Sequence, residues 1–332
     1  MQRLNFAALL HNANYFKELL QGARLCAVVK NDAYGHGAEH VARYLEDVAD
    51  CFAVGTLDEA RRISFVKKDI LILLPMDESD CEKAIKKDFI LTVDSFGTLN
   101  AVLRVTSRLS KKARIHIKIN SGMSRLGFNE NDLDKLINII SNCSNLIVEG
   151  VYSHFYGDNI KDCDNQYAAF CPLAESLEKA LNKKLIKHIA NSNGALLSSK
   201  YHLDMARIGL GLYGYGQKNL HPVKTVNAKV IAIRQIKKGD VAGYGGLYVA
   251  SCSKTIAVVN VGYAHGFNGA LVGAHIKING VMCTVVAVCM AMILVDVSSV
   301  ITAEGDEVIL LGDGVDISNG VISIYELLCN LK

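Results

Sequence analysis

Residues 27–37 read AVVKNDAYGHG, in which an apolar strand delivers one lysine, Lys30, to its end and then breaks into a turn bounded by glycines. An ammonium group at the end of a buried strand costs free energy unless it is paired or neutralised. A desolvated lysine with a lowered pKa is the usual group that forms a Schiff base. The alternative is a strand-end lysine whose ammonium group reaches water. The spacing alone leaves both interpretations open.

The same pattern, a short apolar strand followed by a helix, recurs through the first two thirds of the chain. Strands are predicted at residues 25–30, 51–56, 69–75, 89–94, 114–120, 146–154, 185–191 and 203–208. Between most of them lie segments with a 3.6-residue apolar period. Eight strand–helix repeats predict a TIM barrel, in which catalytic residues lie at the carboxyl ends of the strands. The candidates at or just beyond those ends are Lys30, Arg125, His154, Ser192 and Arg207.

After about residue 221 the pattern contains mainly strands. Residues 254–261 alternate, and residues 275–278 and 281–288 flank Asn279-Gly280, the strongest short signal for a β-hairpin. A final apolar stripe predicts a helix over 321–332 that packs on the barrel or on the β domain. We therefore expect an N-terminal (β/α)8 barrel domain at 1–220 and a smaller, mainly antiparallel β domain at 221–332.

Composition excludes several classes of protein. The 332 residues are half apolar and carry a formal net charge of +3. The basic residues are scattered in pairs, which is typical of solvated faces rather than of a nucleic-acid surface. The ten cysteines form no C-x-x-C pair, and no metal site is predicted. No run reaches the roughly 18 apolar residues of a membrane span and the N-terminus lacks a signal-peptide pattern, so we expect a soluble cytoplasmic protein.

Residues 29–37, VKNDAYGHG, resemble the pyridoxal-phosphate lysine motif of the alanine racemase family. The order of barrel and β domain and several later motifs extend the resemblance over essentially the whole chain. The resemblance implies pyridoxal 5′-phosphate as the cofactor, with Lys30 as its covalent anchor. It also implies that Tyr34 binds the cofactor phosphate, whereas the residues alone allow Tyr34 to pack against the next helix.

Residues 116–128, HIKINSGMSRLGF, are similar to the second block of the family. The resemblance implies that Arg125 donates to the phenolic oxygen of the cofactor and to the substrate carboxylate, for which a planar guanidinium group is well shaped. In many family members the lysine that matches Lys118 is carbamylated, and the carbamate then holds the arginine. A neutral or displaced Lys118 is the alternative.

Two later segments carry predicted cofactor contacts. Residues 191–194 follow a strand and open a short helix, where backbone N–H groups and the Ser192 hydroxyl can bind an anion, although Ser192 can also be a helix cap. Residues 207–214 contain G-x-G-x-x-G, but no helical pattern follows it, so a dinucleotide-binding fold is rejected. The resemblance instead places Arg207 against the pyridine nitrogen of the cofactor, and the amides of Gly209 and Leu210 on its phosphate.

Residues 261–267, VGYAHGF, resemble the motif that carries the second base of the family. Interconverting enantiomers requires one base on each face of a planar carbanion, and the resemblance makes Lys30 and Tyr263 that pair. A free tyrosine keeps its proton at neutral pH. The resemblance assigns His154, together with Arg207, to the network that favours loss of this proton, although a lone histidine at a strand end is more often structural.

Cys289-Met290 resembles the block whose methionine backbone N–H meets the substrate carboxylate. The family completes each site with its β-domain residues from a second subunit, so the resemblance implies a head-to-tail homodimer with shared active sites. Two positions depart from the family pattern, because His265 and Ala291 stand where acidic residues are usual. These departures leave both bases in place and affect substrate gating and side-chain selectivity.

The sequence therefore predicts an alanine racemase that interconverts L- and D-alanine by a two-base pyridoxal-phosphate mechanism and supplies D-alanine for cell-wall peptidoglycan. A racemase of broader specificity, acting on serine or larger amino acids, is the alternative enzyme. A non-catalytic pyridoxal-phosphate carrier is the alternative from another class, and Tyr263 in a complete β domain argues against it.

Overall fold

The computed structural model describes residues 2–246 and 248–331, and the chain divides into two compact units. The barrel unit comprises Leu9–Ala33 and Gly37–His221. The β unit comprises the segment through Ala8, the short stretch Tyr34–His36 and the chain from Pro222 onward. The N-terminal segment thus differs from the expected domain of 1–220, because strand β1 (Gln2–Leu4) pairs with strand β10 (Lys224–Ile236) of the β unit.

Eight parallel strands form the sheet of the barrel unit, in the spatial order β8-β7-β6-β5-β4-β3-β2-β9. Their bounds are β2 (Arg24–Val28), β3 (Cys51–Val54), β4 (Asp69–Ile72), β5 (Ile90–Val93), β6 (Ala113–Lys118), β7 (Leu146–Tyr152), β8 (Ile186–His188) and β9 (Met205–Ile208). Two backbone hydrogen bonds close the ring, because Asp204 donates to the carbonyl of Lys187 (3.1 Å) and Arg207 to that of Ala190 (3.0 Å). The eight predicted strands and the TIM barrel are confirmed.

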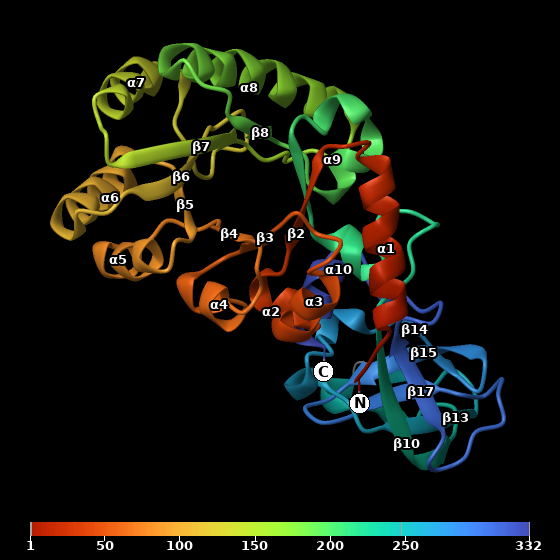
Figure 1. Cartoon of the computed structure of the whole chain (residues 1–332). Coiled ribbons are helices and arrows are strands. Elements are labelled where there is room, and N and C mark those ends of the chain that lie inside the picture. The colour runs from red at the N-terminus through yellow and green to blue at the C-terminus, as the bar shows by residue number, and fades with distance from the viewer. Residues whose placement is uncertain (1, 247, 332) are drawn as a thin grey trace. The chain divides into compact units, whose positions relative to one another are not determined.

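Helices alternate with these strands, and α4 to α8 lie outside the ring of strands (Figure 1). The helices of this part of the chain are α1 (Phe6–Leu19), α3 (Ala38–Leu45), α4 (Leu57–Arg62), α5 (Glu78–Lys86), α6 (Phe96–Leu109), α7 (Leu133–Ser141), α8 (Ile160–Leu181) and α9 (Ser192–Leu197). Several begin at a side-chain cap that accepts a backbone N–H, as Thr56, Asp77, Ser95 and Asn159 do. Their apolar stripes face the strands, which are almost entirely buried.

The segment α2 (Lys30–Gly35), between β2 and α3, is a turn of left-handed helix. The four residues 31–34 have φ between 51° and 54°, and Gly35 has a φ of 74°. Each L-residue in this conformation costs roughly 1–2 kcal/mol. Strand β2 ends at Val28, so Lys30 opens the left-handed turn rather than ending the strand as the sequence predicted.

Side-chain carboxylates hold both ends of this turn within the barrel unit. Glu59 accepts from the backbone N–H of Asn31 (2.8 Å) and from that of Gly55 (2.6 Å), so it joins the turn to the end of β3. Asp32 accepts from the N–H of Ala38, the first residue of α3 (2.9 Å). These bonds offset part of the cost of the left-handed backbone next to Lys30.

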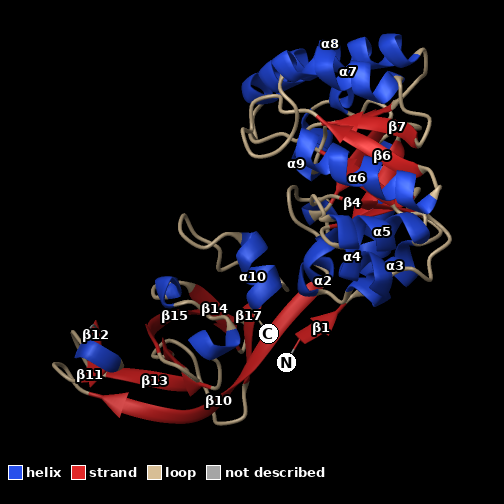
Figure 2. Ribbon diagram, turned by 90° about the vertical axis from the view of Figure 1, so that its left-hand side faces the viewer, coloured by secondary structure: helices blue, strands red, loops and turns tan. Residues whose placement is uncertain are grey.

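The β unit contains an antiparallel sheet in the order β1-β10-β13-β16-β15-β14-β17, and β10 also pairs with β17, which closes six of these strands into a ring. The remaining bounds are β13 (Lys254–Val259), β14 (His275–Ile278), β15 (Val281–Val288), β16 (Ile293–Asp296) and β17 (Glu307–Leu311). Figure 2 shows the long, curved β10 beside β13. The predicted hairpin is confirmed, because β14 and β15 pair across Asn279-Gly280, both with positive φ.

The C-terminal helix α10 (Ile324–Asn330) belongs to the β unit, which decides between the two packing partners that the sequence left open. Its residues Leu327 and Leu328 are buried. Lys224, at the start of β10, is itself buried and donates from Nζ to the carbonyls of Leu328 (2.8 Å) and Leu331 (2.9 Å). A lysine at the last carbonyls of a helix satisfies acceptors that have no partner within the helix.

Within the described residues, no helix is both long enough and apolar enough to span a bilayer.

Candidate active site

Four basic side chains from the barrel unit influence one another at the carboxyl ends of its strands. Lys118, at the end of β6, is only 7% exposed. Burial, together with the positive charges of Arg207, Arg125 and Lys30, lowers its pKa to about 8, while Asp94 acts in the opposite direction. We call Lys30, Lys118, Arg125 and Arg207 the cation cluster. A site with this excess of positive charge is suited to an anionic ligand.

Arg207, at the end region of β9, is 3% exposed and is held by neutral acceptors. Its Nη1 donates to His188 Nδ1 (2.6 Å), and its Nη2 donates to the carbonyl of Ser153 (2.7 Å) and to His154 Nδ1 (3.1 Å). Longer bonds of 3.3 Å reach the carbonyls of His188 and Ile189. No carboxylate within the described residues pairs with Arg207, and burial lowers its pKa. A buried guanidinium group without an anion favours binding of an electron-rich group.

These bonds fix the tautomers of two histidines. A guanidinium group can only donate, so the Nδ1 atoms of His188 and His154 accept, and a neutral ring then carries its proton on Nε2. Burial lowers the pKa of both histidines well below the usual value, and the charge of Arg207 lowers it further. Both rings are therefore neutral around pH 7, and each has an Nε2–H left to donate.

The buried ring of Tyr152, the last residue of β7, faces two cations of the cluster, Lys118 and Arg207. Its ring centroid lies 5.4 Å from Lys118 Nζ and 5.1 Å from the Arg207 guanidinium carbon. The His188 ring stacks on it at 4.7 Å with an interplanar angle of 3°. The Tyr152 hydroxyl shares a hydrogen bond of 2.8 Å with Thr92 Oγ1. Cation–π attraction in a desolvated place contributes about 2 kcal/mol, so this ring stabilises the cations without carrying a charge.

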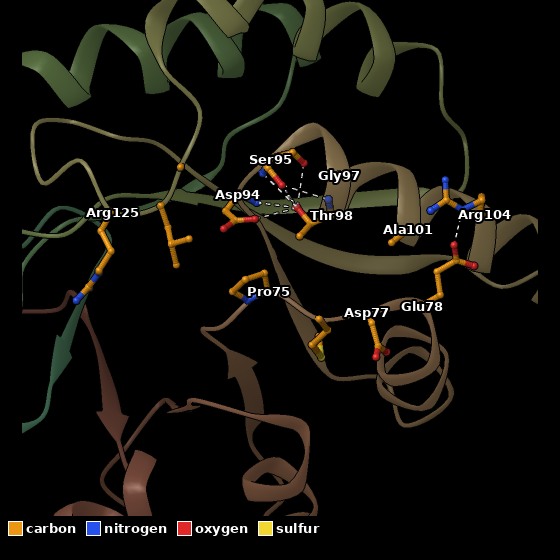
Figure 3. A pocket seen from close by; sticks show the side chains of 13 residues that line it. Pro75, Asp77, Glu78, Asp94, Ser95, Gly97, Thr98, Ala101, Arg104 and Arg125 are labelled. Atoms are coloured by element: carbon orange, nitrogen blue, oxygen red, sulfur yellow. Dashed lines mark hydrogen bonds and ion pairs between the residues drawn. The ribbon is translucent and has the colours of Figure 1, made fainter.

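Arg125 lies on the exposed loop after β6 and lines two hollows. The smaller one is a narrow cavity that Arg125 shares with Lys118, Ser153 and His154. The larger one, of about 760 Å³, lies beside the ends of β4 and β5. Figure 3 shows Arg125 at one side of this larger pocket and the Arg104–Glu78 ion pair at the other. Arg125 therefore lines both the narrow cavity beside Lys118 and the larger open pocket.

Ser192 meets the glycine segment after β9. Its buried Oγ accepts from the N–H groups of Gly209 and Gly211, both at 3.0 Å. The cap of α9 is Asn191, whose Oδ1 accepts from Gly194 N (2.9 Å), so Ser192 is not the helix cap. A hydroxyl that accepts two bonds still has its own O–H to donate.

The β unit carries Tyr263 and Met290 on adjacent loops. Tyr263 N donates to the carbonyl of Cys289 (3.1 Å), and Ala264 N donates to that of Met290 (2.9 Å). Gly262 allows this approach, because a Cβ there would overlap the Cys289 carbonyl oxygen. The Tyr263 and Met290 side chains are 52% and 59% exposed. The two predicted site residues of the β unit thus lie together on its surface.

Two further positions of the β unit bear on the sequence predictions. His265 stands where the family usually has an acidic residue, and its Nδ1 accepts from Gly262 N (3.2 Å). This bond joins the two ends of the turn that carries Tyr263.

Tyr34 is buried, with its ring centroid 5.9 Å from that of Tyr325 in α10. Burial raises the pKa of Tyr34, and the neighbouring Tyr325 adds to this effect, so Tyr34 is a neutral phenol.

Sequence reasoning missed three buried residues near Arg207. His188 accepts a hydrogen bond from Arg207, His116 accepts one from His188, and the Tyr152 ring faces the guanidinium group. Two of these carried a usable signal. His116 comes two residues before Lys118, and Tyr152 two residues before His154. Because side chains alternate along a strand, residues two apart share a face and lie in successive layers of a barrel. His188 offered no comparable spacing.

Fold and site together define a class of enzymes in which a (β/α)8 barrel with basic residues at its strand ends is followed by an antiparallel β unit. Residues 4–217 match the model of the alanine racemase N-terminal domain, and residues 223–332 match that of the C-terminal domain. The chain belongs to the alanine racemase family. Members of this family are pyridoxal-phosphate-dependent isomerases.

Individual relatives agree with this assignment. Alanine racemase 2 of Caldanaerobacter subterraneus subsp. tengcongensis is 33% identical over 329 residues, which cover 93% of this chain and 84% of the relative. The alanine racemase of Staphylococcus epidermidis is 30% identical over 354 residues, covering 99% and 91%.

Solved structures of the family are also similar over the whole chain. The alanine racemase of a D-cycloserine-producing Streptomyces lavendulae has a TM-score of 0.94 at 25% identity, covering 100% of this chain and 94% of that one. The alanine racemase of Clostridium difficile 630 has a TM-score of 0.89 at 31% identity, covering 100% and 93%.

Proposed function

We propose that this protein is a pyridoxal-phosphate-dependent racemase that interconverts L- and D-alanine. The observation that carries the proposal is the buried Arg207, which has only neutral hydrogen-bond acceptors and lies within a cluster of four cations. Pyridoxal phosphate offers three electron-rich groups, namely a phosphate, a phenolic oxygen and a ring nitrogen. The donor set of the barrel unit fits such a ligand.

Each of these groups has candidate partners in the chain. Lys30 would hold the cofactor covalently, and Arg207 would donate to its ring nitrogen. Arg125 would donate to the phenolic oxygen and to the carboxylate of the substrate. The phosphate would accept from Ser192, Leu210 and Tyr34, and from Gly209 when its N–H turns from Ser192 Oγ to the anion. Support for the Ser192 role comes from its hydroxyl, which accepts two backbone bonds and so has its proton left for an anion.

Inversion of an α-carbon needs a proton removed on one face and a proton delivered on the other. Lys30 and Tyr263 are the proposed pair of bases. When bound, the cofactor withdraws electron density from the α-carbon and makes its proton acidic. His154 has its Nε2–H free to donate, because Nδ1 accepts from Arg207. A donor of this kind stabilises a tyrosinate oxygen, which supports the proposed role of His154 beside Tyr263.

Arg207 also influences which reaction follows proton removal. A guanidinium group does not give up its proton, because its pKa stays above about 12 in water. The ring nitrogen of the cofactor would therefore stay largely unprotonated and would be a weaker electron sink. This favours return of the proton to the α-carbon over loss of the amino group.

Lys118 is the proposed site of a carbamate. A pKa of about 8 gives Lys118 a much larger fraction of neutral amine near pH 7.5 than an ordinary lysine has. The neutral Nζ attacks the carbon of CO2, a C–N bond forms and one amine proton leaves to solvent. The product is an anion, so the cation cluster would gain a partner that could hold Arg125. A carbon-13 signal from labelled bicarbonate that disappears in Lys118→Met tests this step.

Exposure of Tyr263 and Met290 supports a head-to-tail homodimer in which these residues complete the site of the partner subunit. Met290 would bind the substrate carboxylate through its backbone N–H.

We further propose a cytoplasmic enzyme that supplies D-alanine for peptidoglycan. His265 and Ala291, which replace acidic residues usual in the family, favour the second candidate, a racemase that also accepts serine or larger side chains.

The test is deuterium incorporation at the α-carbon, followed by chiral chromatography, with the purified chain, pyridoxal phosphate and a panel of amino acids. Equal conversion of L- and D-alanine with solvent deuterium in the product supports the proposal. Faster conversion of serine than of alanine would favour the broader racemase. Cofactor binding without exchange on any amino acid would indicate a carrier protein.

A further inference from the structure

Two buried histidines stand in line behind Arg207. His188 in β8 and His116 in β6 are both buried. Arg207 Nη1 lies 2.6 Å from His188 Nδ1, and His188 Nε2 lies 2.9 Å from His116 Nδ1. The three side chains therefore form one row of hydrogen bonds across the barrel interior.

The direction of these bonds follows from the arginine. Arg207 must donate, so His188 accepts at Nδ1 and carries its proton on Nε2. That proton is donated to His116, whose Nδ1 accepts, so His116 carries its own proton on Nε2. Burial lowers the pKa of His116 to about 3, and the charges of Arg24, Arg114 and Arg207 contribute. The whole row is neutral beyond Arg207 and has one consistent arrangement of protons.

We propose that His188 is a positioning residue for Arg207, and that His116 sets the tautomer of His188 that this task requires. The inference rests on the proposed function, because it concerns how Arg207 is aimed at the cofactor. With the opposite tautomer, the Nδ1–H of His188 would face an N–H of Arg207 and the arginine would lose its shortest bond. His116 supplies the acceptor that favours the useful tautomer.

The buried Nε2–H group of His116, which has no hydrogen-bond partner within the described residues, supports a specific role for this residue. An unsatisfied buried donor is unfavourable, and an apolar ring at this position would avoid the loss. An apolar ring would also leave the Nε2–H of His188 without an acceptor. In this arrangement the unpaired N–H of the two histidines is that of His116 Nε2, and His188 Nδ1 stays available as an acceptor for Arg207.

Gly150 in β7 makes room for the His116 ring. A Cβ added at Gly150 would lie 2.8 Å from three atoms of that ring, which is closer than real contacts. Gly150 does not have the positive φ that would require glycine for backbone reasons. Replacing it with alanine therefore displaces His116 without removing any polar group.

Two substitutions at His188 separate its two bonds. The amide of His188→Asn places an acceptor near the position of Nδ1, so it keeps the bond from Arg207 and loses the one to His116. The amide of His188→Gln reaches the position of Nε2 and keeps only the other bond. We expect His188→Asn to retain kcat within about threefold of the wild type. We expect His188→Gln to lower kcat roughly tenfold or more with little change in KM, the loss expected for one hydrogen bond to a charged group.

Four readouts besides turnover distinguish positioning of Arg207 by His188 from general structural support. The absorbance maximum of bound pyridoxal phosphate and its dissociation constant should shift in His188→Gln and stay in His188→Asn. Pyruvate released per racemisation event should rise only in His188→Gln. Nitrogen-15 spectra of histidine-labelled wild-type protein should show His188 protonated on Nε2, whether or not the protein is a racemase.

A variant that displaces His116 tests whether this second histidine contributes to the positioning of Arg207. Gly150→Ala should resemble His188→Gln in cofactor spectrum, but to a smaller degree. Gly320→Ala, where a Cβ meets open space, is the matched control and should behave as wild type. Equal behaviour of folded His188→Asn and His188→Gln, or an Nδ1–H tautomer for His188, would overturn the inference. A wild-type protein that neither binds the cofactor nor exchanges α-protons would instead contradict the proposed function and leave the tautomer measurement decisive for the row itself.

Discussion

The two units of the molecule hold their proposed site residues in opposite ways. In the barrel unit, Arg207 and Lys118 are almost completely buried, and their ionisation is set by neighbours from several strands. In the β unit, Tyr263 and Met290 stand exposed on two loops that are tied together through backbone groups. The interior of the barrel unit thus sets the ionisation of Arg207 and Lys118, whereas the side chains of Tyr263 and Met290 lie at the surface of the β unit.

Lys30→Ala should have the largest effect, because it removes both the proposed covalent anchor and one of the two bases. We expect racemisation to fall by at least about three orders of magnitude, which is typical for loss of a group that takes part in covalent chemistry. Borohydride reduction followed by mass spectrometry measures the covalent link, and circular dichroism checks the fold. A reducible link that persists in this variant would contradict the assignment of Lys30 as the covalent anchor.

Tyr263→Phe tests the exposed side of the comparison. Racemisation should be lost to a similar extent, while Lys30 still exchanges the α-proton of one enantiomer with solvent. Deuterium exchange of L- and D-alanine, followed separately, measures this asymmetry. Exchange of both enantiomers at the wild-type rate would remove Tyr263 from the mechanism.

The same two variants show whether the exposed residues act in the partner subunit. Mixing inactive Lys30→Ala with inactive Tyr263→Phe and allowing subunit exchange should restore up to half of the sites in each mixed dimer. Native mass spectrometry confirms that mixed dimers exist. If they form and no activity returns, each site is built from one chain.

Lys118→Met tests whether burial sets ionisation in the barrel unit. The pKa of Lys118 is about 8 in the folded chain against an ordinary 10.5. Between these values the unfolded chain holds a proton that the folded chain lacks, so stability rises with pH through this window. In CO2-free buffer the wild type should gain about 1–2 kcal/mol more than Lys118→Met between pH 7.5 and 9.5, as measured by urea unfolding. Parallel pH profiles would mean that Lys118 is solvated.

Glu59→Gln should have the smallest effect, since it leaves the shape unchanged and replaces one of two acceptor oxygens with a donor. Loss of one bond to an exposed or half-buried backbone N–H, at Asn31 or at the end of β3, predicts a destabilisation of about 0.5–1 kcal/mol. Glu18→Gln, the same chemical change at an exposed position of α1, is a suitable control. Unfolding curves compare the two, and equal midpoints would show that Glu59 does not hold the turn.

Much of the fold could be predicted from the sequence because its signals are local. Each barrel strand is a short apolar run, and Asn279-Gly280 encodes its hairpin through two positive φ angles. The pairing of β1 with β10 joins residues more than 200 positions apart, and no local pattern reports it. The support of Arg207 by His188 was missed for the same reason, because β8 and β9 become neighbours only when the eight strands close into a ring.

The left-handed turn after Lys30 makes this stretch a short piece of mirror-image backbone. Residues 31–34 have the positive φ values of a left-handed helix, which D-amino acids prefer, so an L-side chain at each position disfavours this backbone conformation. A semisynthetic protein with D-alanine at position 33 should therefore be more stable than the natural chain, whereas valine or isoleucine there should be poorly tolerated. Sequence variation next to the lysine is limited by handedness as well as by size and polarity.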